Sequence, residues 1–151
     1  MQIARSTLVV VLLVTLSAIV TSTVGCATQE ITYVDTGTTY TLDEAETMAR
    51  QVSKPKFAGE AVLAAEALRQ TQLTTLRAEG EDPAELASLL TDLFPNDQRS
   101  VPYHAEAATV DGDPAWIVVE VWGLQGGNLD NSRVWVLERG TGRVILSATF
   151  D

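Results

Sequence analysis

The sequence has little of the chemistry that disulfides, metal centres and acid–base catalysis usually require. It contains one cysteine, Cys26, and one histidine, His104, in 151 residues. A single cysteine excludes a disulfide within the chain and a metal site built from several thiolates. No phosphate-binding loop, nucleophile elbow or paired-histidine spacing accompanies His104. We therefore expect no metal and no cofactor, and any general base acting at neutral pH would most naturally be His104.

Basic residues are also scarce. Ten lysines and arginines stand against twenty acidic residues, which gives a formal net charge of −10. The longest basic cluster is Lys54-Pro55-Lys56, so this composition argues against binding to nucleic acid or to an anionic membrane through surface basicity. The chain is 46% hydrophobic, and at this length it can bury the core of one domain.

No apolar run is long enough to predict a membrane-spanning helix with confidence. Residues 8–20 are apolar except at Thr15 and Ser17, and they follow a single basic residue, Arg5. A basic start, a short apolar run and small residues after it are typical of an export signal. The signal ends in Thr23-Val24-Gly25-Cys26, which places the only cysteine directly after a small residue.

The segment Thr23-Val24-Gly25-Cys26 resembles the lipobox of bacterial lipoproteins, in which Gly or Ala precedes the cysteine; Thr23 stands where the family prefers Leu. The resemblance implies that residues 1–25 are a signal peptide and that Cys26 becomes the lipidated first residue. Its acyl chains, at about 0.8 kcal/mol per buried methylene, would hold the chain at the extracytoplasmic face of the cell membrane. An uncleaved anchor helix and an ordinary secretory signal are the alternatives.

The segment after Cys26 is rich in threonine and small polar residues, and residues 26–40 are expected to form a tether. A weak alternation at Ile31, Tyr33 and Asp35 also permits a short edge strand. Residues 41–151 are expected to form a single domain.

Three helices are expected between residues 41 and 95. Thr41 and Glu44 form a capping box at the start of a helix over 42–52. A longer helix is expected over 58–79, where small and apolar residues recur at helical spacing.

The third expected helix begins with Asp82 as its cap and Pro83 in its first position. It carries the clearest amphipathic face of the chain. That face consists of Leu86, Leu89, Leu90, Leu93 and Phe94. We expect it to dock the helix on a sheet.

Residues 101–151 contain four runs rich in Val, Ile and Trp, separated by glycine-bearing turns. They predict a four-stranded antiparallel meander, and the whole domain is expected to be α+β, with two or three N-terminal helices packed on that sheet in two layers. This order of elements is similar to that of cystatin-like and NTF2-like folds. The hairpin sequence Val136-Leu137-Glu138-Arg139-Gly140-Thr141-Gly142-Arg143-Val144 also resembles the end of a PepSY-type domain.

The register of the first hairpin depends on the number of residues in its loop. An even number places His104 and Glu106 beside Ile117 and Val119 in the core. An odd number places the two polar residues on the opposite face, with His104 near Glu120 across the strand pair. We expect the odd register because it buries fewer charges.

The second hairpin has Arg139-Gly140-Thr141-Gly142 as its loop. A four-residue loop is expected to pair Glu138 with Arg143. It is also expected to place Leu146 and Phe150 on the face that carries Trp135.

Both faces of the expected sheet are more apolar than a sheet with one solvated face requires. If the helices cover one face only, the other presents an apolar patch of the kind that marks partner surfaces. This candidate interaction face consists of Trp116, Val118, Glu120, Trp122, Val134 and Ile145. The alternative is that the first helix or the tether covers this face and makes it part of the core.

These patterns favour a membrane-anchored, non-catalytic interaction module that binds another protein of the cell envelope. The first alternative is a small-ligand binder with a pocket between the long helix and a curved sheet. Such a pocket would be lined by Leu68, Leu76, Val119 and Trp135. The second alternative is a small hydrolase that uses His104.

Overall fold

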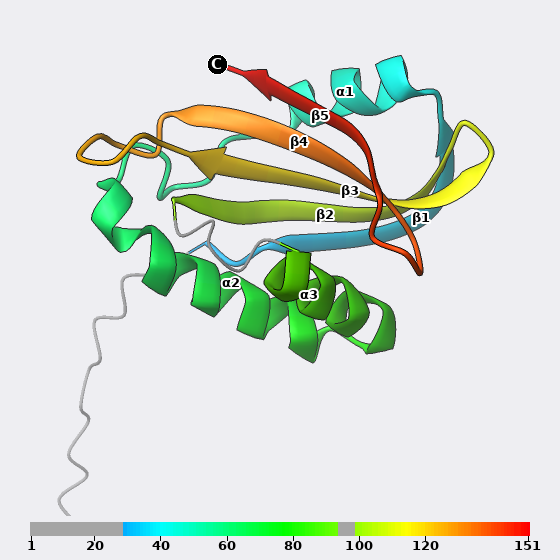
Figure 1. Ribbon diagram of the computed structural model, residues 1–151, viewed down its shortest axis with the longest axis horizontal. Helices are drawn as coiled ribbons and strands as arrows, with labels where there is room; N and C mark the ends of the chain where they lie inside the picture. The colour runs from blue at the N-terminus through cyan, green and yellow to red at the C-terminus, as the bar shows by residue number, and fades with distance from the viewer. Residues whose placement is uncertain (1–28, 94–98) are drawn as a thin grey trace, which may run out of the picture.

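The computed structural model describes residues 29–93 and 99–151, which form helices packed on a five-stranded sheet (Figure 1). The strands lie in the order β1-β2-β3-β4-β5, with β1 parallel to β2 and every other neighbouring pair antiparallel. The helices are α1 (Leu42–Gln51), α2 (Ala65–Ala78), α3 (Glu81–Leu93) and a 3-10 turn η1 (Val62–Ala64). The strands are β1 (Thr32–Tyr40), β2 (Ser100–Val110), β3 (Asp113–Trp122), β4 (Asn131–Glu138) and β5 (Val144–Phe150).

The α+β class and the packing of helices on a sheet are confirmed. The expected four-stranded antiparallel sheet is wrong in strand number and in strand direction, because residues 32–40 form a fifth strand parallel to β2. The tether expected over residues 26–40 is therefore wrong for this part, and the alternative of an edge strand is correct, although the strand is longer than expected. Ile31 is already buried, with 4% of its surface exposed. The expected signal peptide and Cys26 lie outside the described residues.

The two faces of the sheet carry separate hydrophobic clusters, because successive strand residues point to opposite faces. Ile117, Val119 and Val121 pack with Ala45 and Ala49 of α1. We call this side the α1 face. On the other side, the α2–α3 face, α2 and α3 cover a cluster that consists of Ile31, Leu73, Leu76, Leu86, Ala87, Leu90, Ala105, Ala107, Trp116, Val118 and Leu137. Figure 1 shows α1 beside β5, and α2 and α3 on the opposite side of the sheet.

The local helix signals are confirmed in part. Helix α3 begins at Glu81, so Asp82 lies inside its first turn and is not its cap, and Pro83 is not its first residue. Thr41 Oγ1 accepts from the Glu44 amide at 3.3 Å, and the Thr41 amide donates to Glu44 Oε2 at 2.8 Å, which completes the capping box of α1. Helix α2 is shorter than the expected helix over 58–79. The residues before it run along the β3–β4 connection instead, and the Gly59 amide donates to the carbonyl of Leu129 at 2.8 Å.

The first hairpin takes the even register, so the odd register was wrong. Its loop is the two-residue turn Asp111-Gly112, with φ of 50° and 93°, which are the positive values that a type I′ turn requires. His104 therefore pairs with Val119 and lies on the α1 face. The preference of Asp111-Gly112 for this turn outweighs the free-energy cost of burying Glu106. Hydrogen bonds from Tyr40 and Thr36 of β1 to the Glu106 carboxylate reduce that cost.

The second hairpin is partly as expected. The Glu138 amide donates to the Arg143 carbonyl at 2.8 Å, and an ion pair of 3.1 Å joins the two side chains. Leu146 and Phe150, however, lie with the α1-face cluster and not beside Trp135. A register shift in β4–β5 pairing near Val136 moves them to that face.

The first prediction concerns the docking of α3. Leu90 is 1% exposed beneath the helix, whereas Leu93 is 45% exposed. Leu90→Ala should lower the free energy of unfolding by about 2–5 kcal/mol, because it removes buried methyl groups and leaves a cavity. Leu93→Ala is the matched control and should cost much less. Chemical denaturation measures both, and equal losses would contradict this assignment of the buried face.

Candidate functional site

The expected interaction face is not a single exposed surface. Trp116 and Val118 are fully buried, and Glu120 is 3% exposed, all on the α2–α3 face. Val134 pairs with Val119 across β3 and β4 and therefore belongs to the α1 face. Ile145 also packs against the α1-face cluster. The six residues divide between two sheet faces because helices cover both.

Trp122 and Ile145 are the two members of that set that are only partly buried, and Trp122 lies at the end of β3. The guanidinium of Arg133 lies 5.8 Å from its ring and 4.5 Å from the ring of Trp135. Both separations are within the range of a cation–π interaction. Trp122 and Trp135 therefore both contact the Arg133 guanidinium of their own chain.

Glu120 is the centre of a buried charge network on the α2–α3 face. Arg69 Nη1, from α2, lies 3.6 Å from Glu120 Oε2. Arg133 of β4 pairs with Oε1, and the Trp135 indole N–H donates to the same oxygen at 2.7 Å. A buried carboxylate is tolerated when it has partners of this kind.

Arg69 extends the network to α3 and β2. Its Nη2 donates to the carbonyl of Leu90 at 3.1 Å, and its Nη1 donates to Ser100 Oγ at 3.3 Å. One buried guanidinium thus connects helix α2 with α3 and with the start of β2. Because Arg69 and Glu120 are both buried, this network holds the helices on the sheet and does not form a binding surface.

The second prediction tests this network. Glu120→Ala should lower the free energy of unfolding by about 3–5 kcal/mol, because it leaves the buried Arg69 without its carboxylate. Glu46→Ala removes an exposed helical ion pair with Arg50 and should cost no more than about 0.5 kcal/mol. Urea titrations of the two variants make the comparison. Similar midpoints for both would show that the Glu120 network does not clamp the helices.

His104 has a different acidic neighbour from the one expected. Its Nε2 lies 3.8 Å from Glu106 Oε2 on the α1 face, whereas Glu120 points to the α2–α3 face. Glu106 accepts hydrogen bonds from Tyr40 and Thr36 of β1, each at 3.1 Å. The acid–base pair of His104 with Glu120 is therefore not formed, and the carboxylate beside the histidine is held by the added strand.

The surroundings of His104 change its protonation. Burial lowers the pKa of His104, and the nearby Glu106 charge opposes this effect without reversing it. Burial, followed by the same carboxylate, raises the pKa of the Tyr40 hydroxyl. His104 is thus held neutral at pH values where an exposed histidine would begin to bind a proton.

The third prediction follows from this shift. Below the ordinary histidine pKa of about 6.5 the unfolded chain binds a proton that the folded chain does not, so stability should fall as pH drops toward the lower folded pKa. Above pH 6.5 this contribution should be constant. Thermal unfolding between pH 7.5 and 5.5 should show a steeper loss for the wild type than for His104→Gln. Parallel curves would contradict the role assigned to His104.

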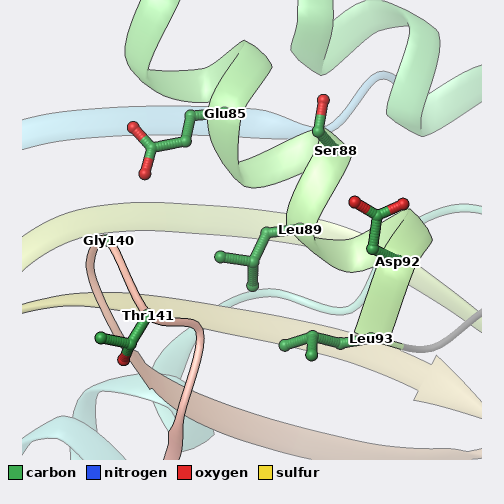
Figure 2. A pocket seen from close by; sticks show the side chains of 7 residues that line it. All are labelled: Glu85, Ser88, Leu89, Asp92, Leu93, Gly140 and Thr141. Atoms are coloured by element: carbon green, nitrogen blue, oxygen red, sulfur yellow. The ribbon is translucent and has the colours of Figure 1, made fainter.

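A pocket lies between α3 and the β4–β5 turn (Figure 2). Its volume is about 330 Å³. Figure 2 shows Leu89 and Leu93 extending from α3 toward the turn that carries Gly140 and Thr141. The full lining consists of Glu85, Ser88, Leu89, Asp92, Leu93, Gly140 and Thr141. Apolar side chains therefore face the turn, with two carboxylates on the same helix.

Two contacts hold the walls of this pocket together. Arg139 pairs with Asp82 at 2.6 Å, which joins the turn to the start of α3, and its guanidinium lies 4.2 Å from the ring of Trp116. Gly142 has φ of +69°, and a Cβ there would lie 2.9 Å from Leu89 Cδ1 and from Leu93 Cδ1. Only glycine fits this close approach without strain.

Sequence reasoning missed the pocket, although it identified most of the elements that form it. Glu85 and Asp92 are seven positions apart on a helix whose apolar face was recognised, which puts them on one side of that helix. Gly142 was recognised only as a turn residue. The glycines on both sides of Thr141 indicate an unusual turn. The local sequence does not indicate that this turn contacts α3.

The expected ligand pocket between helix and sheet is not formed by the residues proposed for it. Leu76 is buried on the α2–α3 face, and Val119 on the α1 face. In residues 29–93 and 99–151, no group of three potential ligands could hold a metal ion, and no helix is long and apolar enough to cross a membrane.

Comparison of the chain with protein-family models, with curated proteins and with solved structures finds no match.

Proposed function

We propose that this protein is a lipid-anchored, extracytoplasmic and non-catalytic interaction module that binds a segment of another envelope protein in the pocket between α3 and the β4–β5 turn. The sequence Thr23-Val24-Gly25-Cys26 supports the anchor and the location. The observation that carries the binding function is the pocket itself, with its apolar wall and its two carboxylates.

The form of the pocket favours a protein segment over an enclosed small molecule. Its volume of about 330 Å³ is at the low end for ligand pockets, which usually bury most of their ligand. Most of its lining is exposed, including Glu85, Asp92 and Thr141. An open site of this size accommodates one or two side chains of a partner.

The charges of the pocket specify the chemistry of that partner. Glu85 and Asp92 are seven residues apart on α3, or roughly 10 Å along the helix axis. Leu89 and Leu93 provide apolar surface beside them (Figure 2). No basic side chain contributes to the lining within the described part of the chain. The complementary segment carries an apolar residue between two basic ones.

The spacing also fits an extended segment. Successive residues of a strand are about 3.3 Å apart and point to alternate faces, so basic residues four positions apart share a face at roughly 13 Å, a span that their long side chains can adjust to the acidic pair. Such a segment can place one cation near Glu85 and the other near Asp92. Its intervening apolar side chain then reaches Leu89.

The fourth prediction tests this site with a defined peptide. A pentapeptide with arginine first and fifth and leucine third should shift the methyl resonances of Leu89 and Leu93. The affinity should weaken at high salt, because exposed charges are screened. The double change Glu85→Lys with Asp92→Lys should reduce binding at least about tenfold, which corresponds to roughly 1.4 kcal/mol.

Two controls accompany the measurement. Glu66→Lys makes the same kind of charge change on the exposed side of α2 and should leave peptide binding nearly intact. A peptide with glutamates in place of the arginines should not bind. Equal binding of both peptides, or unchanged binding by the double variant, would show that the pocket does not recognise basic segments.

A further inference from the structure

The described chain enters the fold almost at once after the expected lipidation site. The Gln29 carbonyl accepts a hydrogen bond from the Gln72 side chain at 3.0 Å, and the Gln29 side chain accepts one from the Lys56 amide at 3.0 Å. Ile31 is buried in the α2–α3 face, and β1 begins at Thr32. The chain is thus attached to the domain three residues after Cys26.

This attachment limits how far the domain can lie from a lipid on Cys26. A fully extended chain spans at most about 3.6 Å per residue, so Gln29 lies within roughly 11 Å of Cys26. The polar interface on each side of a bilayer core is itself several ångströms thick. If Cys26 is anchored in the lipid, the end of the domain around Gln29 lies at the membrane surface.

The surface at this end is formed by two segments that pair with each other. Residues 54–62 run along the β3–β4 connection, where the Leu129 amide donates to the Glu60 carbonyl at 2.8 Å and the Val62 amide donates to the Gly127 carbonyl at 3.0 Å. The first of these segments contains Lys56, the partner of Gln29.

Two exposed leucines flank this pairing. Leu63 is 95% exposed and follows Val62, while Leu124 is 67% exposed and its carbonyl accepts from the Gly127 amide at 2.9 Å. A Cβ on Gly123 would lie 2.7 Å from Val62 Cγ2, which shows how closely the two segments approach. Leucines this exposed gain free energy when an apolar medium covers them.

We propose that this end of the domain docks on the lipid surface that holds Cys26, with Leu63 and Leu124 inserted at the interface. The inference rests on the lipid anchor of the proposed function and adds the orientation of the domain. Insertion of apolar side chains in this way is how interfacial segments bind membranes.

The charges near the two leucines indicate the kind of lipid contact. Lys54 and Lys56 are exposed here, but so are Glu60 and Asp130, and the Lys54 ammonium already donates to the Asp130 carbonyl at 3.3 Å. With this mixture, and with a formal net charge of −10 on the chain, anionic lipid adds little attraction. The contact is apolar, and a zwitterionic bilayer suffices for it.

Docking at this end leaves the pocket free. The β3–β4 connection and the β4–β5 turn lie at opposite ends of β4 (Figure 1). The eight residues of β4 separate them by roughly 25 Å. Gly140 and Thr141 then face away from the bilayer, where a partner protein can reach them.

The fifth prediction uses full-length protein purified from membranes and reconstituted in phosphatidylcholine vesicles. Leu63→Cys and Leu124→Cys introduce a labelling site for a polarity-sensitive fluorophore, since a lipid joined through the Cys26 sulfur blocks the native thiol. Both labels should shift to shorter wavelength and should be quenched several-fold by nitroxide-bearing lipids. Asp113→Cys, at the far end of β3, is the matched control and should show neither effect.

The intact mass of the wild-type protein separates the two proposals. Acyl chains on Cys26 together with labels at 63 and 124 that behave like the label at 113 would overturn the docking and leave the anchor in place. A Cys26 without acyl chains would overturn the anchor and, with it, the docking that depends on it. Acylation together with quenching confined to positions 63 and 124 supports both.

Discussion

Successive residues of β3 are apolar on both sides of the sheet, and this constraint organises the rest of the structure. Trp116 and Val118 point to one face, while Ile117 and Val119 point to the other, and all four are fully buried. A single layer of helices cannot cover both faces. Helix α1 therefore packs on one face with its alanines, which permit a close approach, and the α2–α3 pair covers the other. Trp116 becomes part of the core because the helices divide in this way.

The charged residues inside the fold are tolerated because each has partners from distant elements. Glu120 forms an ion pair with Arg69 of α2 on one face of the sheet. On the other face, Glu106 accepts a hydrogen bond from the Tyr40 hydroxyl of β1. An unpaired carboxylate at either position would cost several kcal/mol. Strand β1 therefore does more than pair its backbone with β2. Its hydroxyl groups donate to Glu106 and so reduce the cost of burying that carboxylate in the even register of the first hairpin. His104 shares that environment and is kept neutral by it.

The exposed apolar surface of the described chain is concentrated at the two ends of the strands. Leu63 and Leu124 lie where the β3–β4 connection meets the segment before α2. Leu93 contributes to the pocket at the β4–β5 turn, which Gly142 brings close to α3. We propose lipid as the contact of the first end and a basic, partly apolar protein segment as the contact of the second. The rigid sheet between them keeps the two contacts apart.

The sequence by itself determined the features whose partners lie within a few residues of each other. The capping box of Thr41 and Glu44 and the pairing of Glu138 with Arg143 follow from spacing alone, as does the α+β class. The pocket between α3 and the β4–β5 turn could not be found in this way, because it requires a glycine turn to meet a helix far away in the chain. Its acidic residues were visible only as a polar helix face.

Only the tertiary structure decided the features that depend on long-range pairing. The segment 32–40 has only weak alternation of apolar and polar residues, so its local sequence does not specify a strand. It forms a strand because it pairs with the otherwise free edge of β2. The odd register of the first hairpin was wrong because the hydrogen bonds from β1 that stabilise buried Glu106 cannot be read from local sequence. The turn at Asp111-Gly112 favours the even register. Burial of Trp116 likewise depends on where α2 and α3 pack. In each case the deciding free energy comes from contacts that no local spacing encodes.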